Sequence, residues 1–182
     1  MDTYRCIVTK REIRTFTDRP VPEEILQQIL NAGRMSGSSK NSQPWHFVVV
    51  RERGRLRELS GFGRFAQHVA SAAAAVCVVI DSPRAFFDAG RCAQNMMLAA
   101  WNAGVASCPA SMHRAEDARS FLGAPEGHVV ATVISFGYPH PKGRGPIERA
   151  ALRILAGRGR RPLASLASWE RYAASRPTPT GI

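Results

Sequence analysis

The sequence predicts one domain built as an α+β or α/β sandwich, and three observations support this prediction. Short apolar segments with the composition of buried strands alternate with segments that have helical patterns. The longest helical segment is apolar nearly all round, so neighbouring structure must cover most of its surface. The chain has 182 residues, of which 45% are apolar, and this is enough to build a substantial core.

Two helices are expected before the first strand. Residues 3–10 are predicted to form a short helix that leads into a basic segment. A second helix opens with Pro-Glu-Glu at residues 22–24, because proline and acidic side chains both favour the first helical turn, and it ends near Gly33. Its apolar face is formed by Ile25, Leu26, Ile29 and Leu30.

Four strands and three further helices are expected after this point. The strands are predicted at residues 45–51, 75–81, 105–111 and 128–136. The helices are predicted at residues 55–60, 83–103 and 114–122, with an irregular stretch after the first of them. The first strand is continuous and apolar, which is typical of a strand in the centre of a sheet.

The longest helix, residues 83–103, carries surplus apolar surface, and a subunit interface is expected to cover it. Proline, glycine and arginine dominate residues 140–162, which predicts a long connection at the start of an extended C-terminal arm, 140–182. Within this arm, residues 163–172 are expected to form a last short helix and residues 175–182 a frayed tail.

Charge and cysteine usage narrow the classes of function. The net charge is +11, but the basic residues are scattered and form no repeat with interleaved aromatics, so nucleic-acid binding is not favoured. The cysteines have no Cys-x-x-Cys or metal-ligand spacing, so they are expected to be buried free thiols in a reducing cytoplasm. They are Cys6, Cys77, Cys92 and Cys108. No apolar run is long enough to span a bilayer, and the N-terminus lacks the apolar core of a signal peptide.

A loop of small polar residues is the first candidate binding segment. Residues 36–45 read Ser-Gly-Ser-Ser-Lys-Asn-Ser-Gln-Pro-Trp and lead directly into the first strand. Small side chains allow backbone N–H groups to reach a ligand, and the amides of Asn41 and Gln43 can both donate and accept hydrogen bonds. Taken alone, the segment also fits an ordinary connection between a helix and a strand.

Two basic segments are the other candidates. Lys10, Arg11 and Arg14 can hold a phosphate through charge and bidentate hydrogen bonds. Arg158 and Arg160 project to one side of extended backbone. Each segment alone also fits a solvated loop or helix end, whereas the three candidates together favour a binding site.

The sequence lacks the patterns of hydrolytic, metal or nucleoside-triphosphate chemistry. The five histidines are scattered, and no Gly-x-Ser-x-Gly elbow is present. Neither a Gly-x-Gly-x-x-Gly fingerprint nor a P-loop occurs. Small polar and basic loops without a nucleophile constellation indicate a bound cofactor that carries the chemistry, while the protein supplies position and electrostatics.

Read in order, these segments resemble the FMN-dependent nitroreductase family. Residues 10–16 are similar to an R-R-S-x-R-x-F pattern, and residues 36–45 are similar to A-P-S-x-x-N-x-Q-P-W. Further similar segments follow in the same order at residues 94–100, 137–139 and 160–163. The resemblance covers nearly the whole chain.

The resemblance implies an α/β/α sandwich around a mixed, mainly antiparallel sheet, in an intertwined homodimer with two FMN molecules at the interface. It implies a ping-pong cycle in which NAD(P)H reduces FMN by hydride transfer to N5, after which nitroaromatics, quinones or similar acceptors are reduced. FMN carries the chemistry, so no side chain is expected to be catalytic.

The resemblance also implies which residues contact the cofactor. The phosphate and ribityl contacts are Lys10, Arg11, Arg14, Arg158 and Arg160. The contacts from the other subunit, to the isoalloxazine and ribityl groups, are Gly37, Ser38, Ser39 and Asn41. The flavin N5 edge is approached by backbone groups of the segment from Pro109 to Ser111.

Three departures from the family pattern matter. Glu12 stands where serine is usual, and a carboxylate beside a phosphate is unfavourable unless Arg11 or Arg14 compensates it or the carboxylate points away. Gly37 replaces the usual proline and is expected to loosen its loop. The chain is compact, so the insertion that often covers the flavin face is expected to be missing and the acceptor pocket to be more exposed.

Two other functions are compatible with the sequence. The same fold can carry a specialised flavin reaction, such as dehalogenation or oxidation of a metabolite, which bound flavin without nicotinamide turnover would indicate. A non-enzymatic flavin- or nucleic-acid-binding protein would use the arginine-rich surface, and salt-sensitive retention of DNA would indicate it.

Overall fold

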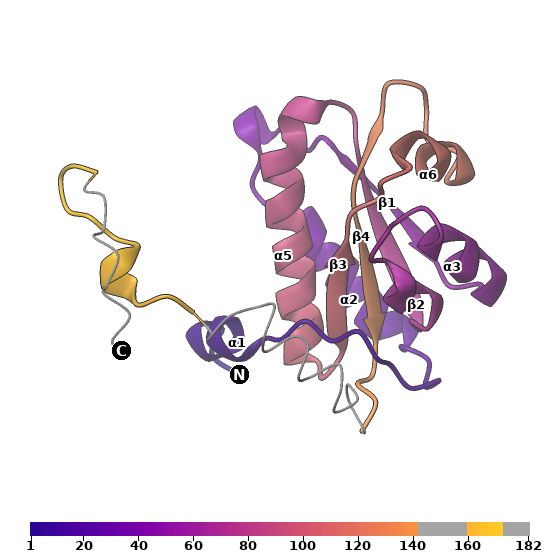
Figure 1. The fold of residues 1–182 in the computed structure, drawn as a ribbon, viewed down its shortest axis with the longest axis horizontal. Helices are drawn as coiled ribbons and strands as arrows, with labels where there is room; N and C mark the ends of the chain where they lie inside the picture. The colour runs from indigo at the N-terminus through magenta and orange to yellow at the C-terminus, as the bar shows by residue number, and fades with distance from the viewer. Residues whose placement is uncertain (142–159, 173–182) are drawn as a thin grey trace, which may run out of the picture. The chain divides into compact units, whose positions relative to one another are not determined.

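A four-stranded antiparallel sheet lies between two layers of helices in the computed structural model (Figure 1). The structure describes residues 1–141 and 160–172. The strands are β1 (Trp45–Val50), β2 (Ala74–Ile80), β3 (Ala106–Ala110) and β4 (Val129–Gly137). They follow the order β1-β2-β4-β3, and each pair of neighbours is antiparallel. Among the described residues, the parallel component is limited to an isolated bridge between Glu12 and Ser107.

Helices cover both faces of this sheet, which confirms the predicted α+β sandwich. One layer contains α2 (Glu23–Arg34) and α5 (Phe86–Asn102), with α1 (Thr3–Thr9) against α5. The other layer contains α3 (Arg53–Ser60), α4 (Gln67–Ala70) and α6 (Ala115–Phe121). Two single 3₁₀ turns, η1 (Ser39–Asn41) and η2 (Pro83–Ala85), precede β1 and α5.

The alternation of side chains along β2 creates two cores, one under each layer. All residues of this strand are buried, as expected for a strand with helices on both faces. The side chains that face α2 and α5 are Val76, Val78 and Ile80. The side chains that face the α3, α4 and α6 layer are Ala75, Cys77 and Val79.

β1 is an edge strand in the described sheet, so its predicted central position is wrong. It pairs with β2 on one side, and no described strand pairs with its other side. Its side chains nevertheless pack on both faces: Trp45 and Phe47 against the α2–α5 core, and Val48 against the other core. A continuous apolar run therefore indicates that helices cover both faces of a strand. It does not indicate whether another strand pairs with each of its edges.

Gly33 allows α2 to approach α5 closely. A Cβ atom at this position would lie 2.2 Å from Met96 Cε and 3.2 Å from Phe47 Cζ. On the neighbouring turn of α5, the Cys92 thiol donates a hydrogen bond to the Gly33 carbonyl oxygen over 3.1 Å. Van der Waals contact and a hydrogen bond from a side chain to the backbone thus join the two helices at one point, and any larger residue at Gly33 would force Met96 and Phe47 to shift.

Two predicted elements differ from the structure. α4 lies in the stretch that was expected to be irregular, because a helix of four residues is too short to show a hydrophobic period. The last helix, expected at residues 163–172, is reduced to the 3₁₀ turn η3 (Leu163–Ser165). Its apolar residues Leu166, Trp169 and Tyr172 are exposed, so no burial offsets the cost of forming a helix.

The chain divides into two units, Met1–Gly143 and Arg144–Ile182, and the elements named above except η3 belong to the first. One domain over the whole chain therefore stays a prediction. No helix among the described residues has the length and apolarity needed to cross a bilayer.

Candidate functional site

The predicted phosphate-binding segment, residues 10–16, runs as extended chain along the free edge of β3. Glu12 forms a parallel bridge with Ser107, and the Ile13 N–H donates to the Ser107 carbonyl oxygen over 3.1 Å. At the other end of the segment, Phe16 bridges to Pro139. These two bridges and the hydrogen bond hold the basic residues beside β3.

The three cations of this segment have different partners. Lys10 forms an ion pair with Glu12, its Nζ lies 3.4 Å from Met97 Sδ, and only 7% of its side chain is exposed. The Arg11 guanidinium folds back and donates to the carbonyl oxygens of Val8 and Lys10, each over 2.9 Å. Glu12 is therefore compensated by Lys10, and the expected compensation by Arg11 or Arg14 is not observed.

Neither Arg11 nor Arg14 has a carboxylate within ion-pairing distance in the described part of the chain, but the Arg11 guanidinium is held by backbone carbonyl oxygens. The positive charge of Arg14 lowers the pKa of His68, and by charge and side-chain hydrogen bonding it opposes the rise that burial causes in the pKa of the Cys108 thiol. An unpaired guanidinium at the edge of β3 can bind an added anion without first breaking an ion pair.

Pro109 and Ser111, predicted to approach the flavin, lie at the end of β3 on the same edge as Arg14. Pro109 is half-buried and Ser111 is exposed. The Ser111 carbonyl oxygen packs against Gly63, where a Cβ atom would lie only 2.9 Å away. The structure thus brings Lys10, Arg14 and the end of β3 together along one edge of the sheet.

The small polar loop lies elsewhere, on the N-terminal half of α5. The Asn95 amide donates to Ser36 Oγ over 2.7 Å, and the Ser39 N–H donates to Asp88 Oδ2 over 3.5 Å. Asn95, a polar residue in an apolar helix, thus helps to hold the loop against α5. A Cβ atom at Gly37 would lie 2.5 Å from the Arg91 guanidinium, so glycine lets the loop lie against Arg91 instead of merely loosening it.

The backbone of this loop is strained. Lys40, Asn41 and Gln43 have φ angles of 51°, 55° and 49°, in the left-handed region that non-glycine residues adopt rarely. Hydrogen bonds hold the loop in this form: the Gln43 N–H donates to Ser38 Oγ over 2.9 Å, and the Asn41 N–H donates to the Ser38 carbonyl oxygen over 3.1 Å. Strain that neighbouring bonds maintain is typical of ligand-binding segments.

The loop and the basic segment lie at opposite ends of α5 within one chain (Figure 1). The loop contacts α5 from Asp88 to Asn95, whereas α1 and Lys10 contact it at Met97, Leu98 and Trp101. The rise of a helix is about 1.5 Å per residue, so Met97, which contacts Lys10, and Asp88, which contacts Ser39, are about 14 Å apart along the axis. One chain therefore does not bring the two predicted halves of the site together.

An open pocket of about 530 Å³ lies on the outer face of α5, beside the small polar loop. It is lined by Phe86, Phe87, Gly90, Arg91, Gln94 and Asn95. Phe87 is 77% exposed, and Phe86 is also exposed. The sequence indicated an apolar surplus on this helix but not a hollow bounded by aromatic and polar side chains.

His68 belongs to a buried polar network that sequence reasoning missed. Its Nδ1 lies 2.7 Å from Ser135 Oγ, which donates to the Cys108 carbonyl oxygen over 3.1 Å. Burial and, second, the charge of Arg14 lower the pKa of His68 to about 4. The sequence signal was one histidine in an alanine-rich stretch, which does not distinguish a core residue from a site residue.

His68 is expected to make the stability of the protein fall in acid. The unfolded chain binds a proton at this histidine below pH 6.5, while the folded chain stays neutral down to about pH 4, so stability is fully present above pH 6.5 and is lost as the pH falls. The contribution is about 3 kcal/mol of unfolding free energy. Urea titrations at pH 7 and pH 4 measure it. The loss should shrink by that amount in His68→Gln, and an equal loss in both proteins would contradict the assignment.

The four cysteines are free and buried, as predicted. Burial raises the pKa of Cys77 to about 12 and that of Cys92 to about 11, so these thiols stay protonated at neutral pH. No group of three metal-ligating side chains occurs within residues 1–141 and 160–172.

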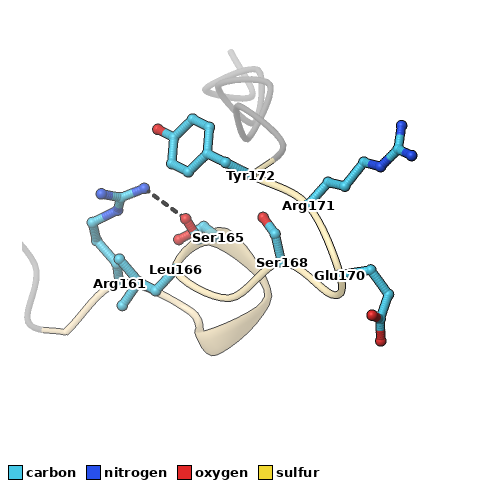
Figure 2. A pocket seen from close by; sticks show the side chains of 7 residues that line it. All are labelled: Arg161, Ser165, Leu166, Ser168, Glu170, Arg171 and Tyr172. Carbon is cyan, nitrogen blue, oxygen red and sulfur yellow. Dashed lines mark hydrogen bonds between the residues drawn. The ribbon is translucent and has the colours of Figure 1, made fainter.

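The C-terminal unit contributes one predicted site residue. Arg160 is exposed, whereas Arg158 lies outside the described residues. Beside Arg160, a shallow pocket of about 600 Å³ is formed by residues of this unit, and the Arg161 side chain donates to the Ser165 carbonyl oxygen over 2.9 Å (Figure 2). The pocket is lined by Arg161, Ser165, Leu166, Ser168, Glu170, Arg171 and Tyr172.

Comparison with known proteins identifies relatives over most of the chain. A relative from Archaeoglobus fulgidus, with the provisional name NADH dehydrogenase/NAD(P)H nitroreductase, is 35% identical over 149 residues, which are 76% of this chain and 86% of the relative. The structure of an FMN-dependent nitroreductase from Clostridium difficile is 25% identical, with a TM-score of 0.73 over 80% of this chain and 94% of that one. The NADPH:FMN oxidoreductase of Vibrio harveyi, complexed with NAD+, is 25% identical, with a TM-score of 0.77 over 96% of this chain and 79% of that one.

The sequence model described as "Nitroreductase family" matches residues 7–77 and 74–138. These residues include the basic segment, the small polar loop and all four strands. The predicted segments therefore lie within the part of the chain that is homologous to the relatives. The chain belongs to the nitroreductase family.

Proposed function

We propose that this protein is an FMN-dependent oxidoreductase that takes a hydride from NAD(P)H and passes electrons to nitroaromatic, quinone or similar acceptors in a ping-pong cycle. The observation that carries the proposal is the separation of two half-sites along α5: a basic edge at β3, which contacts the helix at Met97, and a strained polar loop, which contacts it at Asp88, about 14 Å away along the axis. Each half is built for a ligand, and each is incomplete alone.

A homodimer completes the site. The basic edge of one subunit, with Lys10 and Arg14, faces the loop of the partner, which supplies Gly37, Ser38, Ser39 and Asn41. Exposed apolar side chains surround these segments and support an interface there. They are Tyr4, Ile7, Val8, Met35, Phe86 and Phe87.

The charged side chains and backbone groups at the edge of β3 suit the phosphate and ring system of FMN. Arg14 has no carboxylate partner in the described ranges, Lys10 lies four residues before it, and Pro109 and Ser111 lie at the end of the strand that this segment bridges. A cation near each end of this segment suits a ligand that carries a phosphate and a polar ring system. Arg158 and Arg160 add to the phosphate site in this proposal.

FMN, when bound, supplies the two-electron chemistry, and the chain supplies its position and electrostatics. Lys10 offsets the Glu12 carboxylate beside the phosphate, and Arg14 holds a positive charge at the β3 edge. The pocket on α5 takes the planar acceptor or the nicotinamide in turn. We also place the protein in the cytoplasm, because a reducing compartment keeps its four cysteines free.

Purified protein is expected to be yellow and to lose its flavin absorbance when NADH or NADPH is added without oxygen. Absorbance near the flavin band, followed on anaerobic titration with each nicotinamide, measures this directly, and a later addition of quinone should restore the colour. Colourless protein that takes up no FMN would contradict the proposal. Yellow protein that neither nicotinamide reduces would favour a specialised flavin reaction instead.

A further inference from the structure

The pocket on the outer face of α5 has an aromatic end and a polar end. Residues four apart lie on the same face of a helix, so the lining residues form two neighbouring rows. The rows are Phe86, Gly90 and Gln94, and Phe87, Arg91 and Asn95. Each row begins with an aromatic side chain and ends with an amide, so one ligand can meet both kinds of group along the helix axis.

Gly90 provides the open space in the middle of this pocket. A Cβ atom at this position would have no heavy atom within 4 Å. The rings of Phe86 and Phe87 are exposed at the aromatic end, so the core does not use them. A hollow of about 530 Å³ with aromatic walls and a few polar groups has the size and composition of a small-molecule site. A flat aromatic ring is the ligand group that suits the apolar end.

Arg91 supplies a positive charge between the two ends of the pocket. Its guanidinium carbon lies 5.8 Å from the centroid of the Phe87 ring, and 46% of its side chain is exposed. The Asp88 carboxylate is 3.8 Å away, which is beyond the length of a hydrogen bond. The guanidinium donates no hydrogen bond to any residue that the structure describes, so its N–H groups are available to an anionic ligand.

Gly37 of the small polar loop leaves room for this guanidinium. A Cβ atom at Gly37 would lie 2.5 Å from the Nη2 atom of Arg91, so a larger residue would push the end of the arginine side chain away. Two parts of the chain that are distant in sequence therefore place one cation beside the hollow at Gly90.

We propose that Arg91 selects acceptors that are aromatic carboxylates. The ring lies in the hollow at Gly90 beside the two phenylalanines, and the carboxylate accepts hydrogen bonds from the guanidinium. The net charge of +11 adds a long-range attraction for such anions. This inference rests on the proposed function, which assigns the acceptor to this pocket.

Titration of the purified protein with benzoate and with benzamide tests the selection without turnover. The two ligands have nearly the same shape and differ in charge. Wild-type protein should bind benzoate about tenfold more tightly than benzamide at low ionic strength, and Arg91→Gln should lose this preference. Ligand-observed NMR gives both dissociation constants. Equal affinities for the two ligands in the wild type would overturn the inference.

Arg84→Gln is the matched control for charge. Arg84 is exposed in η2, just before α5, and does not line the pocket. Its substitution removes the same charge from the same region, so the preference for benzoate should stay as in the wild type. An equal loss in Arg84→Gln and Arg91→Gln would overturn the inference, because it would show only a general attraction of anions to a basic protein.

Gly90→Leu tests where the ring lies. The added side chain fills the hollow, so both ligands should bind about tenfold more weakly. Gly90 is exposed on its helix, so the substitution does not disturb the core. Unchanged affinities in this variant would show that the ligands bind elsewhere and would overturn the inference.

Turnover separates the role of Arg91 from the proposed function. With 4-nitrobenzoate and 4-nitrobenzamide as acceptors, the ratio of their kcat/KM values should fall about tenfold in Arg91→Gln, through the KM for the carboxylate. A protein that NAD(P)H reduces, but whose ratio is the same in both forms, would refute the role of Arg91 and leave the proposed function standing. A protein that neither nicotinamide reduces would refute the proposed function, and the titrations would still decide whether this pocket selects anions.

Discussion

Replacing Lys10 with alanine is expected to weaken FMN binding about a hundredfold. Lys10 is the partner of Glu12, so its removal deletes a cation and leaves the Glu12 carboxylate uncompensated at the phosphate end of the proposed site. The two unfavourable changes act together. Titration of the apoprotein with FMN, followed by flavin fluorescence, gives the dissociation constant of each variant.

A second substitution separates the effect of the uncompensated Glu12 carboxylate from the effect of losing the Lys10 charge. Lys10→Ala combined with Glu12→Ala should bind FMN about tenfold more tightly than Lys10→Ala alone, because the repulsion is removed while the lost cation is not replaced. Arg57→Ala, an exposed cation on α3, is the matched control and should bind like the wild type. Equal affinities of the single and double variants would show that Glu12 does not face the phosphate.

The second large effect concerns stability. Gly33→Val should lower the free energy of unfolding by about 1–3 kcal/mol, because the added carbons meet Phe47 and the fully buried Met96, which must shift within a packed core. Urea unfolding followed by circular dichroism measures the change. Some of the variant protein is expected to be lost during expression.

Gly90 provides the control for this prediction. It lies within α5, and a Cβ atom there would have no neighbour within 4 Å. Gly90→Ala should therefore raise the unfolding free energy by about 0.5–1 kcal/mol through helix propensity alone. A Gly33→Val protein as stable as the wild type would mean that the two helices are not in contact at this point.

The sequence predicted the elements of the fold well where apolar residues repeat over several turns. The long apolar α5 and the buried β2 are examples, since their patterns depend only on which faces are covered. The position of β1 could not be predicted, because an edge strand under two helices has the same composition as a central strand. The arm residues 163–172 have a helical spacing of apolar side chains, but a helix also needs a surface on which to bury them.

The sequence indicated the two segments of the candidate site but not which side chains within it contact one another. The basic segment and the polar loop were found from residue type alone. The structure places the basic segment beside β3 and the polar loop on α5. The pairing of Lys10 with Glu12 depends on the backbone conformation just after α1, which residue types alone do not specify. His68 gave no signal, because its partners Ser135 and Arg14 are distant in sequence.

Helix α5 alone sets the spacing between the two proposed half-sites, because both are anchored on it. Asp88 and Asn95 anchor the polar loop, and Met97 and Trp101 anchor the N-terminal segment, on one uninterrupted helix. One residue inserted between Asn95 and Met97 would turn the far end through about 100° and shift it by about 1.5 Å. The anchors would then face different directions, so we expect natural variants of this protein to tolerate insertions in the connecting loops but not in the middle of α5.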